Sequence, residues 1–468
     1  MLKRLSVLSG GALLMLGGCG MQADEGDQGI EQESSNLEAG SNPYGIGDTV
    51  HSTGAIDHTN PFFLAMGTNP RTCETCHAAA QGWTITAAAM KKLFKDSDGL
   101  APVFNLVDTG SSATADVSTK DARRATFDLL IDRAVIRFTR TISPTAQFIV
   151  ASVVDPSGVS DSTKVLSFRR PSPTANESKV PNTGWAGGPA TAGVPAAIQS
   201  TAVGATRGHE QRVDPLSAAD QAAERDFMFG VIFAQSIDNK AGPLDADGAM
   251  GGPVNLAAQV FYPGINDLMG MDPMGHPFSR KVFNLFDAWK DADDCDHGHG
   301  HGHDHNEKRD RARASIYRGQ ELFNSYEFDI TGVAGLNDLM GQTTVRGTCS
   351  TCHNTPNVGA HSVFRQFDID SANQENCGEG LPLITLQNKV TGATRVVCDM
   401  GRATGTGLWA DIGKFTAPRL RGLAARAPYF HDGQAKDIEA VVRYYNKRFN
   451  MHLSGNEKRD LEAFLGAL

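Results

Sequence analysis

The chain has 468 residues, of which 40% are hydrophobic and 21% charged, and its formal net charge is −10. This length exceeds one ordinary hydrophobic core, so we expect two or three domains in a globular protein. The negative charge argues against nucleic acid as a partner, because phosphate backbones are bound by basic surfaces.

The first residues have the pattern of an export signal. Lys3 and Arg4 precede an apolar run that is too short to span a bilayer, which predicts a signal peptide over residues 1–18. The run ends in Leu16-Gly17-Gly18-Cys19, similar to a bacterial lipoprotein box, in which the cysteine is acylated and anchors the protein to a membrane. Ordinary secretion without a lipid is the alternative. Residues 19–48, rich in Gly, Glu, Gln and Ser, predict a flexible tether.

Residues 49–240 form the first predicted domain, and its marker is Cys73-Glu-Thr-Cys76-His77. This C-x-x-C-H pentad is typical of covalent c-type haem attachment. Cysteines three residues apart lie about one helical turn apart, so both thiols reach the vinyl groups of one porphyrin while His77 meets the iron. The alternative for a C-x-x-C pair is a zinc or redox site, which the adjacent histidine disfavours.

The residue pattern of the first domain predicts helices with a small β element. Two segments of alternating residues flank Asp155-Pro-Ser-Gly158, which predicts a β-hairpin. These segments are 146–154 and 164–168. Helices are expected at 84–94, 118–137 and 218–237. We therefore expect a mainly α fold with a β-hairpin in the first domain.

Residues 241–307 form a long connecting insertion, with a helix expected at 278–289. Between Cys295 and His305, histidines occupy alternate positions. Such a tract can wrap zinc, copper or nickel. The alternative is a solvated low-complexity insertion with incidental metal affinity.

Residues 308–468 form the second predicted domain, which carries a second pentad, Cys349-Ser-Thr-Cys352-His353. Two pentads predict a di-haem c-type cytochrome in which His77 and His353 are the proximal iron ligands. Cys377 and Cys398 are expected to form a disulfide, since haem attachment implies export to an oxidising compartment. Two buried thiols are the alternative. Helices are expected at 311–324, 435–449 and 457–468.

An internal repeat relates the two domains. Pro418-Arg-Leu-Arg421 and Phe430-His-Asp-Gly433 follow the second pentad. Pro171-Ser-Pro-Thr174 and Trp185-Ala-Gly-Gly188 follow the first pentad at similar offsets. The spacing predicts two related haem domains, of which the first has diverged.

Residues 310–468 resemble the second domain of the bacterial di-haem cytochrome c peroxidase superfamily, which includes the enzyme that matures the tryptophan-derived cofactor of methylamine dehydrogenase. The matching segments are 417–422, 427–433 and 438–446. The first domain matches through its pentad and the repeat. The resemblance implies that the second haem takes electrons from a small electron-transfer protein. It also implies that the first haem binds hydrogen peroxide, and that a distal acid-base group helps break the O–O bond.

The resemblance also suggests site residues. Tyr445 falls where the peroxidases place methionine and the maturation enzyme places tyrosine, so it is the expected far-side ligand of the second haem. Met451 and Met400 are competitors, and a core tyrosine is the alternative. The family's W-D-G-R is replaced by Trp185-Ala-Gly-Gly188, so His209 or Glu210 is expected to supply the distal ligand or the catalytic acid-base group. An ordinary hydrogen-bonded histidine is the alternative to His209.

Further residues are expected near the haems. Arg419 and Arg421 are expected to pair with porphyrin propionates, or else to lie on the surface. The tryptophans are expected either to pack against other side chains or to relay electrons between the haems. The remaining candidates are His361 and His431 at the second haem, Trp83 at the first, and Trp185 or Trp409 as a relay.

Three functions follow from these expectations. The first is an exported, lipid-anchored di-haem oxidoreductase of the peroxidase type, at the periplasmic or outer-membrane face. The second is a non-catalytic electron-transfer cytochrome on the same fold. The third is a metal-binding surface lipoprotein that acts through the histidine-rich tract.

Overall fold

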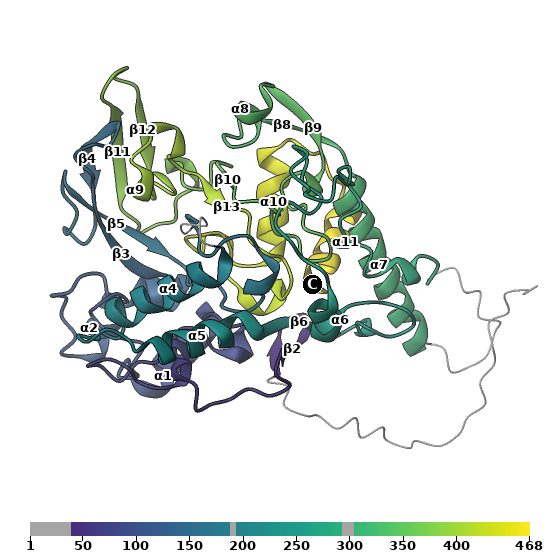
Figure 1. Ribbon diagram of the computed structural model, residues 1–468, viewed down its shortest axis with the longest axis horizontal. Coiled ribbons are helices and arrows are strands. Elements are labelled where there is room, and N and C mark those ends of the chain that lie inside the picture. The colour runs from purple at the N-terminus through teal and green to yellow at the C-terminus, as the bar shows by residue number, and fades with distance from the viewer. Residues whose placement is uncertain (1–38, 188–192, 293–303) are drawn as a thin grey trace, which may run out of the picture. The chain divides into compact units, whose positions relative to one another are not determined.

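The computed structural model describes residues 39–187, 193–292 and 304–468 (Figure 1). The predicted signal peptide, Cys19 and most of the histidine-rich tract lie outside these residues. About 33% of the residues are helical and about 17% lie in strands, which neither confirms nor contradicts a mainly α fold. The helices are α1 (Ala87–Ser97), α2 (Lys120–Thr126), α3 (Asp128–Arg133), α4 (Val194–Gly208), α5 (Ala218–Gly230), α6 (Gly252–Ala258), α7 (Asp304–Ser325), α8 (Asn337–Met340), α9 (Ala403–Thr406), α10 (Ile438–Arg448) and α11 (Gly455–Gly466).

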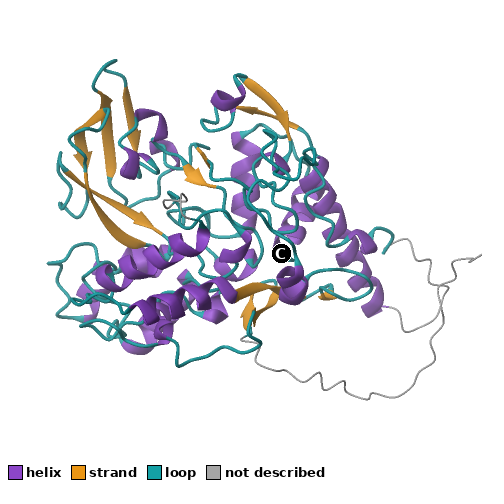
Figure 2. Cartoon of the chain, in the orientation of Figure 1, coloured by secondary structure: helices purple, strands orange, loops and turns teal. Residues whose placement is uncertain are grey.

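The strands form five small sheets within the described ranges (Figure 2). They are β1 (Gly40–Asn42), β2 (Gly45–His51), β3 (Ile136–Thr141), β4 (Phe148–Val154), β5 (Lys164–Arg169), β6 (Val231–Asp238), β7 (Gly242–Pro243), β8 (Phe328–Thr331), β9 (Thr344–Gly347), β10 (Gln366–Phe367), β11 (Leu383–Asn388), β12 (Thr394–Val397) and β13 (Phe415–Thr416). The largest sheet has the order β1-β2-β6-β7. Strand β2 pairs antiparallel with β6, from Gly45↔Asp238 to His51↔Val231. Residues 40–42 and 45–48 of the segment expected to be a tether therefore lie in strands, and residues 19–38 lie outside the described ranges.

The segments expected to form a β-hairpin are both strands, but they do not pair with each other. Strand β4 pairs antiparallel with β11 in the second half of the chain, from Phe148↔Asn388 to Val154↔Leu383. Strand β5 pairs with β3, from Ile136↔Arg169 to Thr141↔Lys164. The hairpin prediction was wrong because alternation identifies a strand and does not identify its partner.

Three helix predictions need correction. The segment 118–137 holds two short helices, α2 and α3, and then begins β3. Helix α5 ends at Gly230, after which the buried β-branched and aromatic residues of β6 continue as a central strand. The segment 278–289 contains only a short turn at Asp287–Trp289, because side chains of α7 bind its backbone. Asn324 accepts from the N–H groups of Val282 and Phe283 at 3.1 and 3.0 Å.

The largest core cluster lies in the second half of the chain, around α7, α10 and α11. Helices α7 and α11 approach closely at Gly319, where a Cβ would lie 2.0 Å from the carbonyl oxygen of Asp460. Ser454 and Glu457 form the capping box expected at the start of α11. The helices at 311–324, 435–449 and 457–468 are thus confirmed as α7, α10 and α11.

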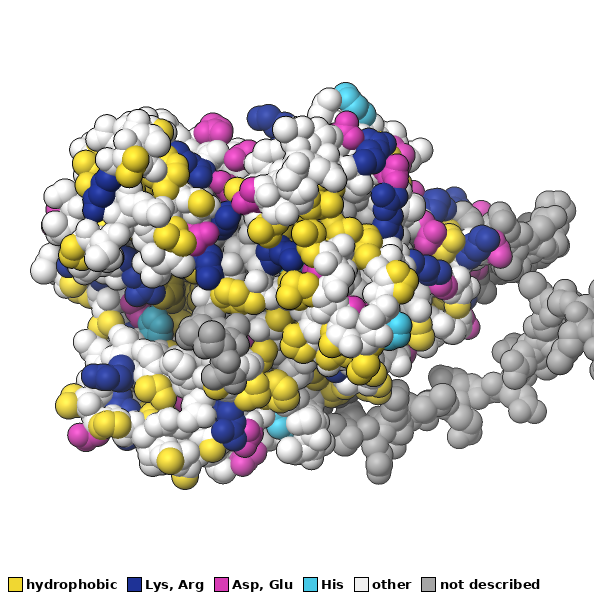
Figure 3. All heavy atoms as spheres, turned by 45° about the horizontal axis from the view of Figure 1, so that its top comes forward, with side chains coloured by type: hydrophobic (Ala, Val, Ile, Leu, Met, Phe, Trp, Pro, Cys, Tyr) yellow, Lys and Arg dark blue, Asp and Glu magenta, His cyan; other side chains and the backbone are white. Residues whose placement is uncertain are grey.

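None of the described helices is both long and apolar enough to cross a lipid bilayer. On the face drawn in Figure 3, acidic and basic side chains are interspersed among hydrophobic ones. The net negative charge is therefore not gathered into one patch on this face.

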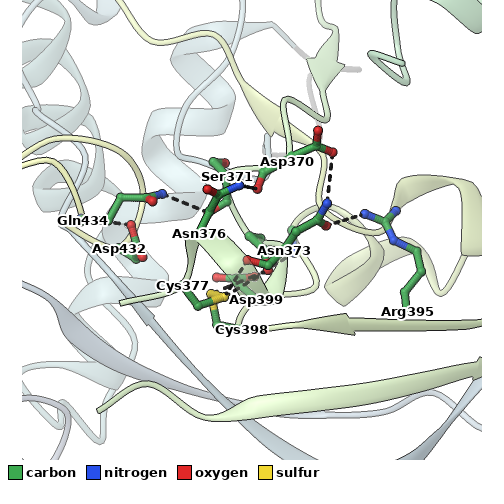
Figure 4. Close-up of a disulfide and its surroundings, with 12 residues drawn as sticks. Asp370, Ser371, Asn373, Asn376, Cys377, Arg395, Cys398, Asp399, Asp432 and Gln434 are labelled. Atoms are coloured by element: carbon green, nitrogen blue, oxygen red, sulfur yellow. Dashed lines mark hydrogen bonds between the residues drawn. A yellow bond between two sulfur atoms is a disulfide. The ribbon is translucent and has the colours of Figure 1, made fainter. Parts of the chain in front are cut away.

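The predicted disulfide between Cys377 and Cys398 is confirmed. Figure 4 shows it beside Asp399, which lies next to Cys398 in the chain. The carboxylate of Asp399 accepts two hydrogen bonds from Arg169 of β5, at 2.6 and 2.7 Å, and both side chains are buried. This bidentate ion pair and the β4–β11 pairing join the two halves of the chain.

We expect Asp399→Ala to lower the free energy of unfolding by ~3–5 kcal/mol, because it leaves the buried Arg169 guanidinium without its carboxylate. Asp226→Ala is the control, since it removes a largely exposed carboxylate beside Arg225, which is expected to cost under ~1 kcal/mol. Urea unfolding of wild type and both variants at pH 7 measures the difference.

The stability that the Asp399–Arg169 ion pair contributes depends on pH. Burial raises the pKa of Asp399, but the charge and hydrogen bonds of Arg169 outweigh burial and hold it below its usual value. The ion pair therefore stabilises the fold fully above the unfolded pKa of about 4, and this stabilisation is lost as pH falls through the lower folded value. An Asp399→Ala variant as stable as wild type at pH 7 contradicts this assignment.

Candidate functional site

Both C-x-x-C-H pentads fold in the same way. Each begins with a 3-10 turn, Cys73–Thr75 in the first and Cys349–Thr351 in the second. In each, the threonine before the first cysteine donates its backbone N–H to the hydroxyl of the threonine three residues on, at 3.0 Å. The shared T-C-x-T-C-H sequence therefore produces the same capped turn twice.

The two pentad histidines are held by the same contact. Nδ1 of His77 lies 3.1 Å from the carbonyl oxygen of Trp83, and Nδ1 of His353 lies 2.6 Å from that of Gly359. Both carbonyls belong to residues in the left-handed conformation, with φ of 61° and 72°. An Nδ1–H donated to a carbonyl leaves the Nε2 lone pair available to a metal. Burial also lowers the pKa of His77 to about 4, which keeps its ring neutral.

The second pentad opens onto a cavity of about 220 Å³. Cys349, Cys352 and His353 line it, together with Tyr445 and Met451. Most of the remaining lining is apolar, as a porphyrin face requires. The apolar lining residues include Phe323, Phe328, Ile330, Val333, Phe367, Leu420, Leu423, Val442, Phe449, Leu453, Leu461 and Leu465.

Tyr445 differs from three other tyrosines in this half of the chain. The hydroxyls of Tyr326, Tyr429 and Tyr444 each donate to a backbone carbonyl. The hydroxyl of Tyr445 has no such partner within the described parts of the chain. Burial raises its pKa, and the nearby Cys352 raises it further. Tyr445 thus places an unpaired hydroxyl beside the cysteines, whereas Met400 packs in a separate core cluster and does not line the cavity.

Three buried arginines, Arg170, Arg419 and Arg426, also line the cavity. They are connected to one another, since Arg170 donates to the carbonyl of Arg426 at 2.7 Å and Arg426 donates to that of Arg419 at 3.0 Å. Among the described residues, the carboxylate that contacts this cluster is Glu177, which pairs with Arg419 at 3.0 Å. Burial lowers the pKa of Arg170 to about 10 and that of Arg426 to about 9.

The arginine cluster fits a cofactor that carries carboxylates. The Nε atoms of all three guanidinium groups have no hydrogen-bond partner among the described residues. Buried charges are normally paired, so this excess of positive charge indicates an anionic group in the cavity. A c-type haem brings two propionates, an apolar porphyrin and an iron, which match the arginines, the apolar lining and His353.

Other residues expected at the second haem have different roles. The guanidinium of buried Arg421 donates to the carbonyls of Leu468, Asn357 and Gly252, so it is neither a cavity residue nor a surface residue. His361 lines the cavity, with Nδ1 2.9 Å from the carbonyl of Cys352.

Two further aromatic residues line the cavity, one from each half of the chain. The ring of His431 stacks on Phe415 at 4.1 Å, and neither ring nitrogen has a partner among the described residues. The indole of Trp185 donates to the carbonyl of Arg170 at 2.8 Å, whereas Trp409 packs against a separate core cluster away from the cavity.

The first pentad has a more polar neighbourhood. His209 directly follows α4, and its Nδ1 contacts the carboxylate of Asp108. Arg71, two residues before Cys73, pairs with the other oxygen of Asp108 at 2.5 Å and donates to the carbonyl of His209. The structure thus brings His209 to the first pentad, together with two residues that the sequence analysis did not find.

Two buried glutamates lie near Cys73. Glu210 accepts from the N–H of Met66 at 2.9 Å, and its other oxygen lies 3.7 Å from the Cys73 sulfur. Glu224 of α5 is fully buried, and neither of its oxygens has a partner among the described residues. Burial raises the pKa of Glu224 to about 7, and the charge of Glu210 contributes to the shift. The capping-box pattern at Ser217 located α5 but gave no sign of the buried carboxyl.

Comparison with known proteins gives distant relatives and no matching family model. A cytochrome-c peroxidase, IdrP2, from Denitromonas iodatirespirans is 29% identical over 136 residues, 27% of this chain and 37% of that protein. Cytochrome c551 peroxidase from Pseudomonas aeruginosa is 29% identical over 121 residues, 26% of this chain and 30% of that protein. The methylamine utilization protein MauG from Paracoccus denitrificans is 26% identical over 137 residues, 28% of this chain and 31% of that protein.

These matches span about a third of the length of the curated relatives. A solved MauG-like protein associated with microbial copper homeostasis is 14% identical and aligns over 87% of both chains, with a TM-score of 0.33, too low to support an argument about fold. The relatives agree with the resemblance seen in the residues of the second half. The chain is a divergent relative of the bacterial di-haem cytochrome c peroxidases and MauG.

Proposed function

We propose that the chain is an exported di-haem c-type oxidoreductase of the peroxidase type, which reduces hydrogen peroxide with electrons from a small electron-transfer protein. One observation carries the proposal. Both pentads hold their histidine in the same way, by an Nδ1 contact to a carbonyl six residues on. Such a contact is typical of histidines that bind a metal through Nε2. The peroxidase relatives supply the reaction class.

Each pentad supplies the cysteines and the histidine of one haem site. Cys73 and Cys76 hold the first haem, and Cys349 and Cys352 hold the second, with His77 and His353 as proximal ligands. Bound haem supplies one-electron chemistry at iron. In the overall reaction, hydrogen peroxide takes up two electrons and two protons and leaves as two molecules of water. Tyr445 and its competitor Met451 line the same cavity as His353, and either would offer a ligand atom to the second haem.

Two parts of the proposal concern location and partners. Export and a lipid on Cys19, at the periplasmic or outer-membrane face, rest on the sequence of the first 19 residues. The donor is a small redox protein, by analogy with the peroxidase relatives. A non-catalytic electron carrier is the second candidate, because the acidic and arginine residues of the family's W-D-G-R are absent at Trp185-Ala-Gly-Gly188.

Haem content tests the proposal first. Chain expressed with a c-type haem-ligation system should show two haems per chain in a pyridine haemochrome assay. Cys352→Ser and Cys76→Ser should weaken attachment of one haem each, because one thioether bond is lost. Electron paramagnetic resonance during peroxide titration then separates the two candidates. A high-spin, peroxide-reactive haem supports the oxidoreductase, and two inert low-spin haems support the carrier.

Tyr445→Phe should raise the reduction potential of the second haem, since a phenolate ligand stabilises ferric iron more than the ligands that replace it. Tyr444→Phe is the matched control, because the Tyr444 hydroxyl donates to the carbonyl of Ile369 at 2.6 Å. Potentiometric titration followed by optical absorbance measures both. If Tyr445→Phe leaves the potential unchanged while Met451→Leu alters the spectrum, Met451 is the ligand instead.

Gly359→Ala should disturb the second haem site, because the added Cβ would lie 2.8 Å from the Phe283 ring and 2.9 Å from Leu420. Moving this residue displaces the carbonyl that orients His353. Gly392→Ala is the control, with the same φ of 72° and open space around its Cβ. Both substitutions should cost ~1–2 kcal/mol of backbone strain. The electron paramagnetic resonance signals of the second haem should change only in Gly359→Ala. Equal spectra in both variants would refute the role of the contact between His353 and the Gly359 carbonyl.

A further inference from the structure

Asp108, His209 and Arg71 form a fixed group at the first pentad. The side chain of Asp108 accepts from His209 through one oxygen and from Arg71 through the other. Burial raises the pKa of Asp108, but its bonds to His209 and Arg71 outweigh burial and lower it overall, so the carboxylate is charged. Arg71 donates a second hydrogen bond to the carbonyl of His209, which closes a ring of contacts among the three residues.

This group is anchored from several elements of the fold. The N–H of Arg137 in β3 donates to the carbonyl of Asp108 at 2.5 Å. Asn69 donates to the carbonyl of His209 at 2.9 Å and accepts from the N–H of Arg71 at 3.1 Å. The His209 ring also meets the ring of Phe138 edge to face at 6.2 Å. These contacts fix both the position and the plane of the imidazole.

The group lies within electrostatic reach of the whole first pentad. Burial raises the pKa of the Cys76 thiol to about 12, and the charge of Asp108 adds to that shift. His209 contributes to the low pKa of His77. The residue after His209, Glu210, contacts the Cys73 sulfur. Phe138 packs in the same core cluster as Cys76. A haem bound at Cys73 and Cys76 is therefore next to His209.

We propose that His209 and Asp108 form a proton-transfer dyad of the first haem site, with Arg71 as a second positioning residue. The proposal rests on the proposed function, and it adds Asp108 and Arg71 to the candidate His209. Donation of Nδ1–H to Asp108 leaves Nε2 of His209 bare. The His209 side chain is 36% exposed, so peroxide and water reach it from solvent.

The chemistry of the dyad concerns one proton. Nε2 of His209 accepts the proton from one oxygen of hydrogen peroxide and returns it to the other oxygen, which leaves as water. This relay adds no proton of its own, so both protons that the overall reaction consumes come from solvent. Together with two electrons from the reduced donor protein, they convert the remaining oxygen into the second water. Asp108 stabilises the positive charge that His209 carries between the two transfers, and it does so without moving.

A histidine at the second cavity is held differently. Nδ1 of His361 lies 2.9 Å from the carbonyl oxygen of Cys352, while Nε2 lies 3.2 Å from Arg365 and 3.9 Å from Asp267, which Arg365 also contacts. The His361 side chain is buried, so, unlike His209, it presents no bare nitrogen to solvent. His431 lacks a carboxylate hydrogen bond. The dyad therefore distinguishes the first site from the second, although their pentads are alike.

The test uses the full two-haem protein and the variants His209→Gln and Asp108→Asn. Matched controls are His276→Gln, whose side chain is 69% exposed, and Asp132→Asn, whose side chain is 44% exposed. Haem content and circular dichroism confirm loading and folding. Stopped-flow absorbance should show the second-order rate constant with peroxide lowered roughly 100-fold or more in His209→Gln, as expected for loss of an acid-base group. Asp108→Asn should lower it roughly 10–100-fold, and the controls should match wild type.

A second measurement does not depend on turnover. Nitrogen-15 spectra of histidine-labelled protein, reduced and bound to carbon monoxide, report which imidazole nitrogen carries a proton. The signals missing in His209→Gln identify this residue. In wild type Nδ1 should carry the proton, and in Asp108→Asn that signal should weaken. An unchanged proton distribution in Asp108→Asn would overturn the positioning role of Asp108.

Three further outcomes each overturn a different part of the proposal. Two loaded haems that do not react with peroxide in wild type overturn the proposed function. A reactive wild type and an equally reactive His209→Gln overturn the dyad alone. If electron paramagnetic resonance shows a low-spin first haem that becomes high-spin in His209→Gln, the residue is an iron ligand and the proton-transfer role fails.

Discussion

The hydrogen bond between a pentad histidine and a carbonyl six residues on is the contact on which both haem sites depend. It requires the chain to turn back sharply after each pentad, and the turning residue is left-handed in both copies. At Gly359 this conformation is inexpensive, but at Trp83 it costs ~1–2 kcal/mol for a residue with a side chain. The buried indole of Trp83 offsets part of this cost through its packing and its hydrogen bond to Thr49 at 2.9 Å. The same geometry therefore persists on two different local sequences.

The buried charge of Arg419 acts on both pentads. Arg419 pairs with Glu177 of the first half while it lines the cavity of the second pentad. Its charge also contributes to the low pKa of His77 at the first pentad. Among the described residues the three guanidinium groups that line the cavity of the second pentad have a single carboxylate partner, which is unfavourable in an apolar interior, and haem propionates would complete the pairing. A haem bound at the second pentad would therefore supply part of the charge balance between the halves, and its attachment would be coupled to the assembly of the fold.

Local patterns in the sequence predicted the parts of the structure that local chemistry decides. The pentads, α7, α10, α11 and the Cys377–Cys398 disulfide are of this kind. The β-hairpin prediction was wrong because β4 pairs with β11, more than 200 residues away in the chain. The length of the loop between two strands does not reveal such a pairing. Asp108 and Arg170 were missed for a similar reason. Each acts through a contact with a distant segment, and neither stands in a motif of its own.

The two haem sites share a pentad and differ in almost everything around it. The second is a largely apolar cavity, lined also by buried guanidinium groups and by Tyr445, a setting that favours a closed coordination sphere and electron transfer. The first has a half-exposed histidine fixed by a buried carboxylate, a setting that favours proton transfer. Peroxide reduction needs both electrons and protons. The proposed division, with electrons entering at the second site and proton transfer at the first, follows from this difference in surroundings.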